Sequence, residues 1–330
     1  MRRVAALLAA ALLAAGLLGC GGGGAEPGAP RGATLVLDFQ PNAVHSGIYA
    51  AQARSYFKDA GVDLTVREPS SSADGPKLLE SGRTDFAVMD INDFGIARER
   101  GLDLVAIAAI VQRPLASVIA RDPSVIRTPA DLAGKTVGVT GVPSDDAVLD
   151  TVLRSGGVDP SSVHRVTIGF NAVSALAAGK IDAATAFWNA EGVQLRQMHV
   201  PTREFRVDQF GAPRYPELVV ATSRRSCSLA HDFVDGLDRG YAILGANPSL
   251  ALNDVLSEVP GLDRDSQRAQ LAALIAANAF LATAAGGSVT PDLDPGRTRA
   301  WLDWATSHGL VSPAAAPKIG AGFRPGTGCS

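Results

Sequence analysis

The chain has 330 residues, of which 46% are hydrophobic, enough to bury a substantial core over a length that suits two domains rather than one. Its formal charge at pH 7 is −3, from 30 basic and 33 acidic residues, and this mildly acidic balance argues against nucleic acid as a partner. After the first residues, no apolar stretch reaches the length that spans a membrane without polar interruption.

The first residues have the features of a secretory signal. Arg2 and Arg3 precede an apolar run over 4–18, which is too short for an ordinary membrane-spanning helix. The run ends in Leu-Leu-Gly-Cys, which resembles the lipobox of bacterial lipoproteins. The resemblance implies that 1–19 is a removed signal peptide and that Cys20 carries the lipid. The alternative is a plain signal peptide followed by a chance cysteine.

A glycine-rich segment, 20–32, follows as a flexible tether that would hold a folded domain off the membrane. Together, these features predict an extracytoplasmic bacterial lipoprotein that is anchored to the cell membrane.

Two further cysteines, Cys227 and Cys329, form an even pair in an oxidising compartment. We expect a disulfide between them, and the alternative is two unrelated thiols. No cluster of His and Cys surrounds either one, so we expect no metal there. We also expect no cofactor.

Strands and helices alternate through the first part of the chain. Apolar alternation and glycine stops predict strands at 34–38, 62–66, 85–89 and 104–110, with helices at 46–60, 75–81 and 94–100.

The same order then repeats. We predict strands at 135–140, 165–168 and 181–187, with helices at 145–154 and 171–178. The segment 82–88 (GRTDFAV) also matches 179–185 (GKIDAAT). Such punctuation is common in α/β proteins, but the shared order favours two similar lobes, each a mostly parallel sheet flanked by helices.

Two β-rich segments, 111–122 and 217–222, lie at the borders of the repeat, and we predict that they form the two strands of a hinge. They predict a first lobe made of 33–114 and 220–330, and a second lobe made of 115–219.

The chain beyond residue 223 is mostly helical, with predicted helices at 229–244, 249–258, 265–285 and 294–308. Trp301 and Trp304 share a face of the last helix and read as core anchors that pack it onto the first lobe, with a binding role as the alternative.

Polar groups follow the first strand. Asp38, Asn42 and His45 lie between the strand's carboxyl end and a helix that begins near Ser46. In open α/β sheets this crevice holds ligands, and helix N-termini offer unpaired N–H groups. The alternative is a polar loop with a helix cap at Ser46.

This organisation resembles the solute-binding lipoproteins of ABC importers, of the type II two-lobe class. More narrowly, the chain resembles the family of aliphatic-sulfonate and thiamine-pyrimidine (hydroxymethylpyrimidine) binders. The segment 38–49 is similar to the pyrimidine branch's Asp-Trp-x-Pro-Asn-x-x-His-x-Gly-x-Tyr signature, with Phe39 in place of Trp. The segment 187–191 is similar to its aromatic-Trp-x-x-Glu marker. The resemblance implies a monomer that captures a small molecule by lobe closure and then docks on an ABC permease with its ATPase subunit.

The repeat places four strand ends, 38–46, 90–93, 140–146 and 188–191, across a cleft from one another. Phe39 and Trp188 would then sandwich a flat ring from opposite lobes. Asp38 and Glu191 would accept hydrogen bonds from a ring amine or a protonated ring nitrogen.

For most of the other polar residues in these segments, two interpretations remain open. Asn42 offers a donor and an acceptor. His45 either contacts ligand or fixes the Asp38 loop from behind, and Ser144 either caps a helix or reaches the ligand. Asp90 and Asn92 are either ligand groups or loop caps.

The four segments hold six acidic residues and no Lys or Arg. This composition favours a cationic or amine-bearing ring, with a thiamine-precursor pyrimidine as the leading ligand. A sulfonate, a nitrate-like anion or a flavin is the alternative within the binding class.

An enzyme is the alternative from another class. Hydroxymethylpyrimidine-phosphate synthases share the fold and the opening signature, but their CCCFC motif is absent from this sequence. The sequence also contains no Gly-x-Ser-x-Gly elbow and no Walker loop, so we expect no catalytic residue. A structural lipoprotein with a dead cleft is disfavoured by the acids and aromatic residues.

Overall fold

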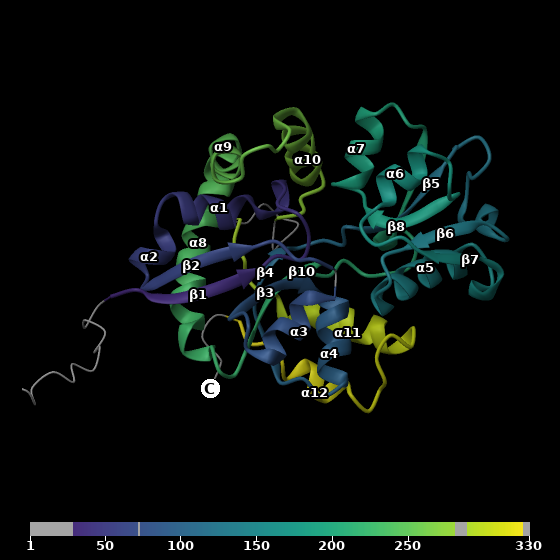
Figure 1. Cartoon of the computed structure of the whole chain (residues 1–330). Coiled ribbons are helices and arrows are strands. Elements are labelled where there is room, and N and C mark those ends of the chain that lie inside the picture. Colours follow the sequence, from purple (N-terminus) through teal and green to yellow (C-terminus); the bar gives the residue numbers. More distant parts are fainter. Residues whose placement is uncertain (1–28, 72, 281–288, 326–330) are drawn as a thin grey trace, which may run out of the picture.

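Two stretches of alternating strands and helices fold into two separate five-stranded sheets (Figure 1). The computed structural model describes residues 29–71, 73–280 and 289–325. The first sheet has the order β2 (Val62–Arg67), β1 (Arg31–Val36), β3 (Phe86–Asp90), β10 (Leu218–Ser223), β4 (Leu104–Val111). The second has the order β7 (His164–Thr167), β6 (Thr136–Val139), β8 (Ala183–Phe187), β5 (Ala116–Arg121), β9 (Thr202–Arg206).

The two sheets have the same topology. In the first, β1 pairs in parallel with β2 and β3, and β10 runs antiparallel between β3 and β4. In the second, β6 pairs in parallel with β7 and β8, and β5 runs antiparallel between β8 and β9. The prediction of two similar, mostly parallel sheets is therefore confirmed.

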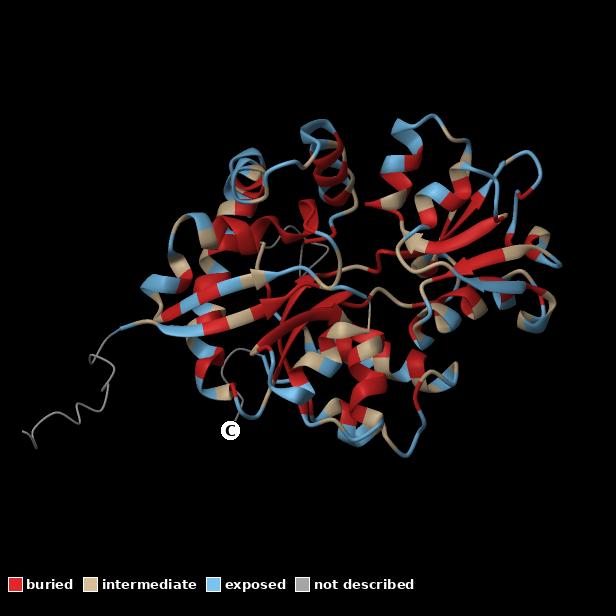
Figure 2. Ribbon diagram, viewed as in Figure 1, coloured by how far each residue is buried: buried red, intermediate tan, exposed pale blue. Residues whose placement is uncertain are grey.

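Helices cover both sheets, and their buried faces turn toward the strands (Figure 2). The second lobe carries α5 (Pro143–Ser155), α6 (Ala172–Ala177) and α7 (Glu191–Gln197). The first lobe carries α1 (Ser46–Ala53), α2 (Tyr56–Asp59), α3 (Asp74–Ser81), α4 (Ile91–Glu99), α8 (Ala230–Ala246), α9 (Pro248–Glu258), α10 (Arg264–Ala276), α11 (Pro295–Ser307) and α12 (Ala316–Gly320).

Two predicted helices differ from the structure. The helix expected over 46–60 is broken into α1 and α2, because Ser55 has a φ of 58° and left-handed backbone ends an α-helix. The helix expected over 265–285 ends at Ala276, and 281–285 lies outside the described residues. Sequence patterns also missed β9, α7 and α12.

The chain crosses between the sheets twice, through 112–115 and through 207–217. The two predicted hinge pieces lie at these crossings, and their strands, β5 and β10, each lie inside a sheet with a neighbour on both sides. Interior strands satisfy their backbone groups on both edges. Leu218 and Val219 accordingly belong to the first sheet and not to the second lobe; the other lobe limits stay predictions.

The repeat extends to individual hydrogen bonds. Asp85 Oδ2 accepts from the Thr34 N–H at 2.8 Å, and Asp182 Oδ2 accepts from the Thr136 N–H at 2.8 Å. Each aspartate follows a glycine with left-handed backbone that ends a helix. In both lobes, the matched segment therefore ends a helix and links the strand that follows to β1 or to β6, respectively.

The last long helix is anchored to the first lobe as predicted. Trp301 is fully buried and Trp304 is 5% exposed, and both lie in the core that α4, α11 and α12 share with the sheet. The Trp301 Nε1–H donates to Asn92 Oδ1 at 2.7 Å.

The cysteine predictions fall largely outside the described residues. Cys227 is disulfide-bonded, but Cys329 lies outside them, so the pairing stays a prediction. Cys20, the signal peptide over 1–19 and most of the tether lie outside them as well. Within the described part of the chain, none of the helices has the length and apolar composition that a membrane crossing requires.

We predict that Asp182→Ala lowers the free energy of unfolding by about 1–3 kcal/mol, because the Thr136 N–H loses its side-chain acceptor. Urea unfolding followed by circular dichroism measures the change. Asp63→Ala on β2, whose side chain is exposed, is the control and should stay within about 0.5 kcal/mol of wild type. Equal stability of Asp182→Ala and wild type would contradict the prediction.

Candidate functional site

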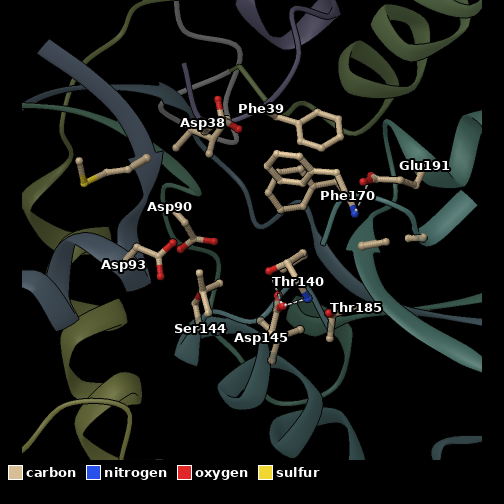
Figure 3. Close-up of a pocket in the computed structure, with 18 of the residues that line it drawn as sticks. Asp38, Phe39, Asp90, Asp93, Thr140, Ser144, Asp145, Phe170, Thr185 and Glu191 are labelled. Carbon is tan, nitrogen blue, oxygen red and sulfur yellow. Dashed lines mark hydrogen bonds between the residues drawn. The ribbon is translucent and has the colours of Figure 1, made fainter. Parts of the chain in front are cut away.

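A pocket of about 870 Å³, open solvent at its mouth included, lies between the two lobes (Figure 3). The first lobe contributes residues that follow β1 and residues at the end of β3. The second contributes the loops after β6 and β7 and the end of β8. The carboxyl ends of parallel strands therefore face each other across the pocket, as the repeat predicted.

Aromatic rings form one part of the wall. The rings of Phe39 and Phe170 meet edge to face, with centroids 4.7 Å apart and planes at 86°. Phe187, the last residue of β8, also lines the pocket. All three side chains are partly exposed, so their apolar surfaces are available to a flat ring.

The predicted sandwich between Phe39 and Trp188 is wrong. Trp188 is fully buried, its Nε1–H donates to the Pro114 carbonyl at 3.0 Å, and the Arg206 guanidinium lies 4.1 Å above its ring. Successive residues at a strand end point to opposite sides, so Phe187 faces the pocket and Trp188 faces the core. Phe170 was missed because it follows a short, exposed strand with no aromatic neighbour in sequence.

Two polar residues of the loop that follows β1, Asn42 and His45, stabilise that loop by hydrogen bonds. His45 is fully buried, its Nδ1 accepts from the Asn42 N–H at 3.2 Å, and its Nε2–H therefore donates to Asp38 Oδ1 at 2.9 Å. Asn42 Oδ1 accepts from the Val44 N–H at 2.9 Å. Neither Asn42 nor His45 lines the pocket, so the prediction of ligand contact is corrected for both, whereas Asp38 does line it.

The start of α4 supplies two more acids. Asp90 caps this helix, with Oδ1 accepting from the Asn92 N–H at 2.6 Å, and Asp93 lies in its first turn. Both line the pocket. Asn92 is fully buried against Trp301 and does not reach the pocket, so its predicted ligand role is corrected.

The start of α5 faces them from the second lobe. Ser144 is 5% exposed, lines the pocket and hydrogen-bonds the Asp93 side chain. Asp145 also lines the pocket, and its Oδ2 accepts from the Thr140 hydroxyl at 2.6 Å. Glu191, at the start of α7, completes the acidic lining, with Oε2 accepting from the Phe187 N–H at 3.1 Å.

Burial changes the charge state of these acids. It raises the pKa of Glu191 to about 7, against the lowering effect of backbone hydrogen bonds. Burial also raises the pKa of Asp90, of Asp93 and of Asp145. Among the described residues, five carboxyl groups and no Lys, Arg or His line the pocket. Such a lining suits hydrogen-bond donors and positive charge on a ligand.

The described part of the chain contains no group of three or more His, Cys, Asp or Glu side chains that could hold a metal ion.

The two sheets and the pocket between them define a periplasmic-binding-protein fold. The alkanesulfonate-binding protein SsuA from Xanthomonas axonopodis pv. citri, solved bound to MOPS, superposes with a TM-score of 0.69 at 17% identity. The superposition covers 90% of this chain and 99% of that protein.

Comparison of the sequence with known proteins identifies the family within this fold. The family model described as NMT1/THI5 like matches residues 42–251, and this chain belongs to that family. A formylaminopyrimidine-binding protein of Halalkalibacterium halodurans is 31% identical over 228 residues, which are 68% of this chain and 69% of that relative. A 4-amino-5-hydroxymethyl-2-methylpyrimidine phosphate synthase of Legionella pneumophila is 28% identical over 176 residues, 53% and 55% of the two chains.

We predict that Glu191 makes the stability of the protein fall between pH 4.5 and about 7. The folded chain keeps the proton to about pH 7, whereas the unfolded chain releases it near 4.5, so the free energy of unfolding decreases as the pH rises. Urea unfolding at several pH values should show that Glu191→Gln removes up to about 3 kcal/mol of this decrease. Identical pH profiles for the variant and wild type would contradict the assignment.

Proposed function

We propose that this protein is the extracytoplasmic solute-binding protein of an ABC importer and that it captures a small aromatic, amine-bearing solute. A thiamine-precursor pyrimidine is the leading candidate. The observation that carries the proposal is a pocket between two lobes with aromatic rings, five carboxyl groups and no basic side chain among the described residues.

An aminopyrimidine suits this lining. Its flat ring would contact Phe39, Phe170 and Phe187, where aromatic contacts add roughly 0.5–1.5 kcal/mol beyond the burial of area. Glu191 would accept from the exocyclic amine and pair with the ring nitrogen. Because its pKa is about 7, Glu191 can take part in that pair as carboxylate or as acid. The relative that binds formylaminopyrimidine supports the same ligand class.

A sulfonate or nitrate-like anion suits the pocket poorly. Structural neighbours bind such anions, but at 17% identity and below they bear on the fold alone. The pocket carboxyl groups repel an anion when ionised and supply no positive charge when protonated, and no cation lines the described pocket to hold it.

A synthase activity also has less support. The Legionella synthase and this chain match over about half of each. The CCCFC motif that the resemblance ties to that reaction is absent from the sequence, which has three cysteines in all.

Capture would proceed by closure of the two lobes about the crossings at 112–115 and 207–217. The ligand shifts the balance toward the closed form by as much as it binds that form more tightly. In this proposal the protein acts as a monomer, a lipid on Cys20 holds it at the membrane, and the closed form docks on the permease.

A thermal-shift screen of the purified protein tests the ligand class. The panel holds thiamine, hydroxymethylpyrimidine, formylaminopyrimidine, riboflavin, taurine and nitrate. A pyrimidine at 100 times its dissociation constant should stabilise the fold by about 2.7 kcal/mol. A shift with taurine or nitrate alone would overturn the pyrimidine proposal.

We further predict that Phe170→Ala weakens pyrimidine binding by about threefold to tenfold, because one ring contact is lost. Glu191→Gln should weaken it at least as much. Trp188→Phe, a conservative change in the core, is the matched control and should leave the dissociation constant within about twofold of wild type. Isothermal titration calorimetry measures all three, and strong weakening by Trp188→Phe alone would contradict the placement of the site.

A further inference from the structure

The pocket has a second acidic side, away from Glu191. Asp90 and Asp93 come from the start of α4, and Asp145 comes from the start of α5 in the other lobe. Figure 3 shows Asp90 and Asp93 on one side of the cavity and Glu191 on the other. A ring held beside Glu191 and the phenylalanines would therefore leave this side for a substituent.

Glu217 lies directly behind Asp90. It is fully buried at the end of the crossing 207–217, and its Oε2 accepts from the Leu115 N–H, in the other crossing, at 2.9 Å. Oε1 has no hydrogen-bond partner among the described residues. Leu218 pairs with Asp90 across the sheet, which places Glu217 beside Asp90, and the two carboxyl groups interact. Two neighbouring carboxyl groups disfavour ionisation of both when no cation lies beside them, so we expect this pair to hold one proton.

The groups around this pair supply no such cation. Asp90 and Glu217 face Asp93, Asp145, Asp208 and the Tyr215 hydroxyl. Arg113 forms its ion pair with Asp208, at 2.7 Å. The charge of Arg100 lowers the pKa of Asp93, but burial outweighs it. Burial raises the pKa of Asp90 well above its ordinary value and that of Glu217 to about 7, the direction expected when positive charge is missing.

We infer that this side of the pocket is a subsite for a cationic group of the ligand, which takes the place of the proton shared by Asp90 and Glu217. The ligand class is then an aromatic ring with an ammonium substituent. Binding of the ammonium releases one proton from the pair to solvent, so the charge of the buried site is conserved. This inference rests on the proposed function, because both concern the same pocket.

Glu217 acts here as a positioning residue. Its carboxyl joins Asp90 to the Leu115 N–H, and its own backbone N–H donates to the Val111 carbonyl at 3.0 Å. The Ile91 N–H donates to the Glu217 carbonyl at 2.9 Å. The cation subsite is therefore fixed to both chain crossings.

Two probes with the same ring test the subsite. They are 4-amino-5-aminomethyl-2-methylpyrimidine, which is cationic at pH 7, and its neutral 5-hydroxymethyl counterpart. Isothermal titration of the full chain in two buffers of different ionisation enthalpy counts the protons released. We expect the aminomethyl probe to bind at least about tenfold more tightly and to release about one proton, and the hydroxymethyl probe to release none.

Asp90→Asn keeps the side-chain oxygen that caps α4 and should abolish the preference for the aminomethyl probe. Glu217→Gln should abolish proton release while ring binding persists; if it does not fold, Asp90→Asn decides. The matched control is Asp238→Asn on α8, an acid whose pKa burial raises to about 6 outside the pocket, and it should change neither readout.

Equal affinity and equal proton release for the two probes would overturn this inference and leave the proposed function standing. If neither pyrimidine binds, the proposed function fails. The same measurements with benzylamine and benzyl alcohol, another pair of equal shape, then decide the subsite. A preference for benzylamine that Asp90→Asn removes supports it, and no preference overturns it.

Discussion

The chemistry of this site follows from five carboxyl groups that the two lobes bring together in one half-buried pocket. A carboxylate loses several kcal/mol of hydration when it is buried, and here no basic side chain of the described pocket repays that loss. Desolvation therefore raises the pKa of Asp90, of Asp93 and of Asp145, and it raises that of Glu191 to about 7. Under the proposed function, the same desolvation favours a ligand that carries positive charge.

Duplication of one topology builds this pocket. Each lobe supplies parallel strands that end at the same edge, and equivalent aspartates, Asp85 and Asp182, tie the third strand of each copy to the first. In the described part of the chain, two crossings connect the copies, and Glu217 in the second accepts a hydrogen bond from the Leu115 N–H in the first.

The helical C-terminal part supports the site, although none of its described residues lines the pocket. Trp301 on α11 packs against α4 at Gly95, where an added Cβ would lie 2.5 Å from its ring, and its N–H holds Asn92. The helix that carries Asp90 and Asp93 is thus fixed from its far side. Trp301, which the sequence predicted to be a core anchor, thus helps to position Asp90 and Asp93.

Local patterns predicted the alternating elements, the repeat and the acidic character of the strand ends, because glycine stops, apolar periodicity and side-chain charge are local properties. The folded chain was needed to show that Phe187 faces the pocket while Trp188 is buried, that Phe170 lines the same pocket, and that Glu217 interacts with Asp90. These depend on the direction in which a side chain leaves its strand and on contacts between residues more than 100 positions apart, which no local pattern carries.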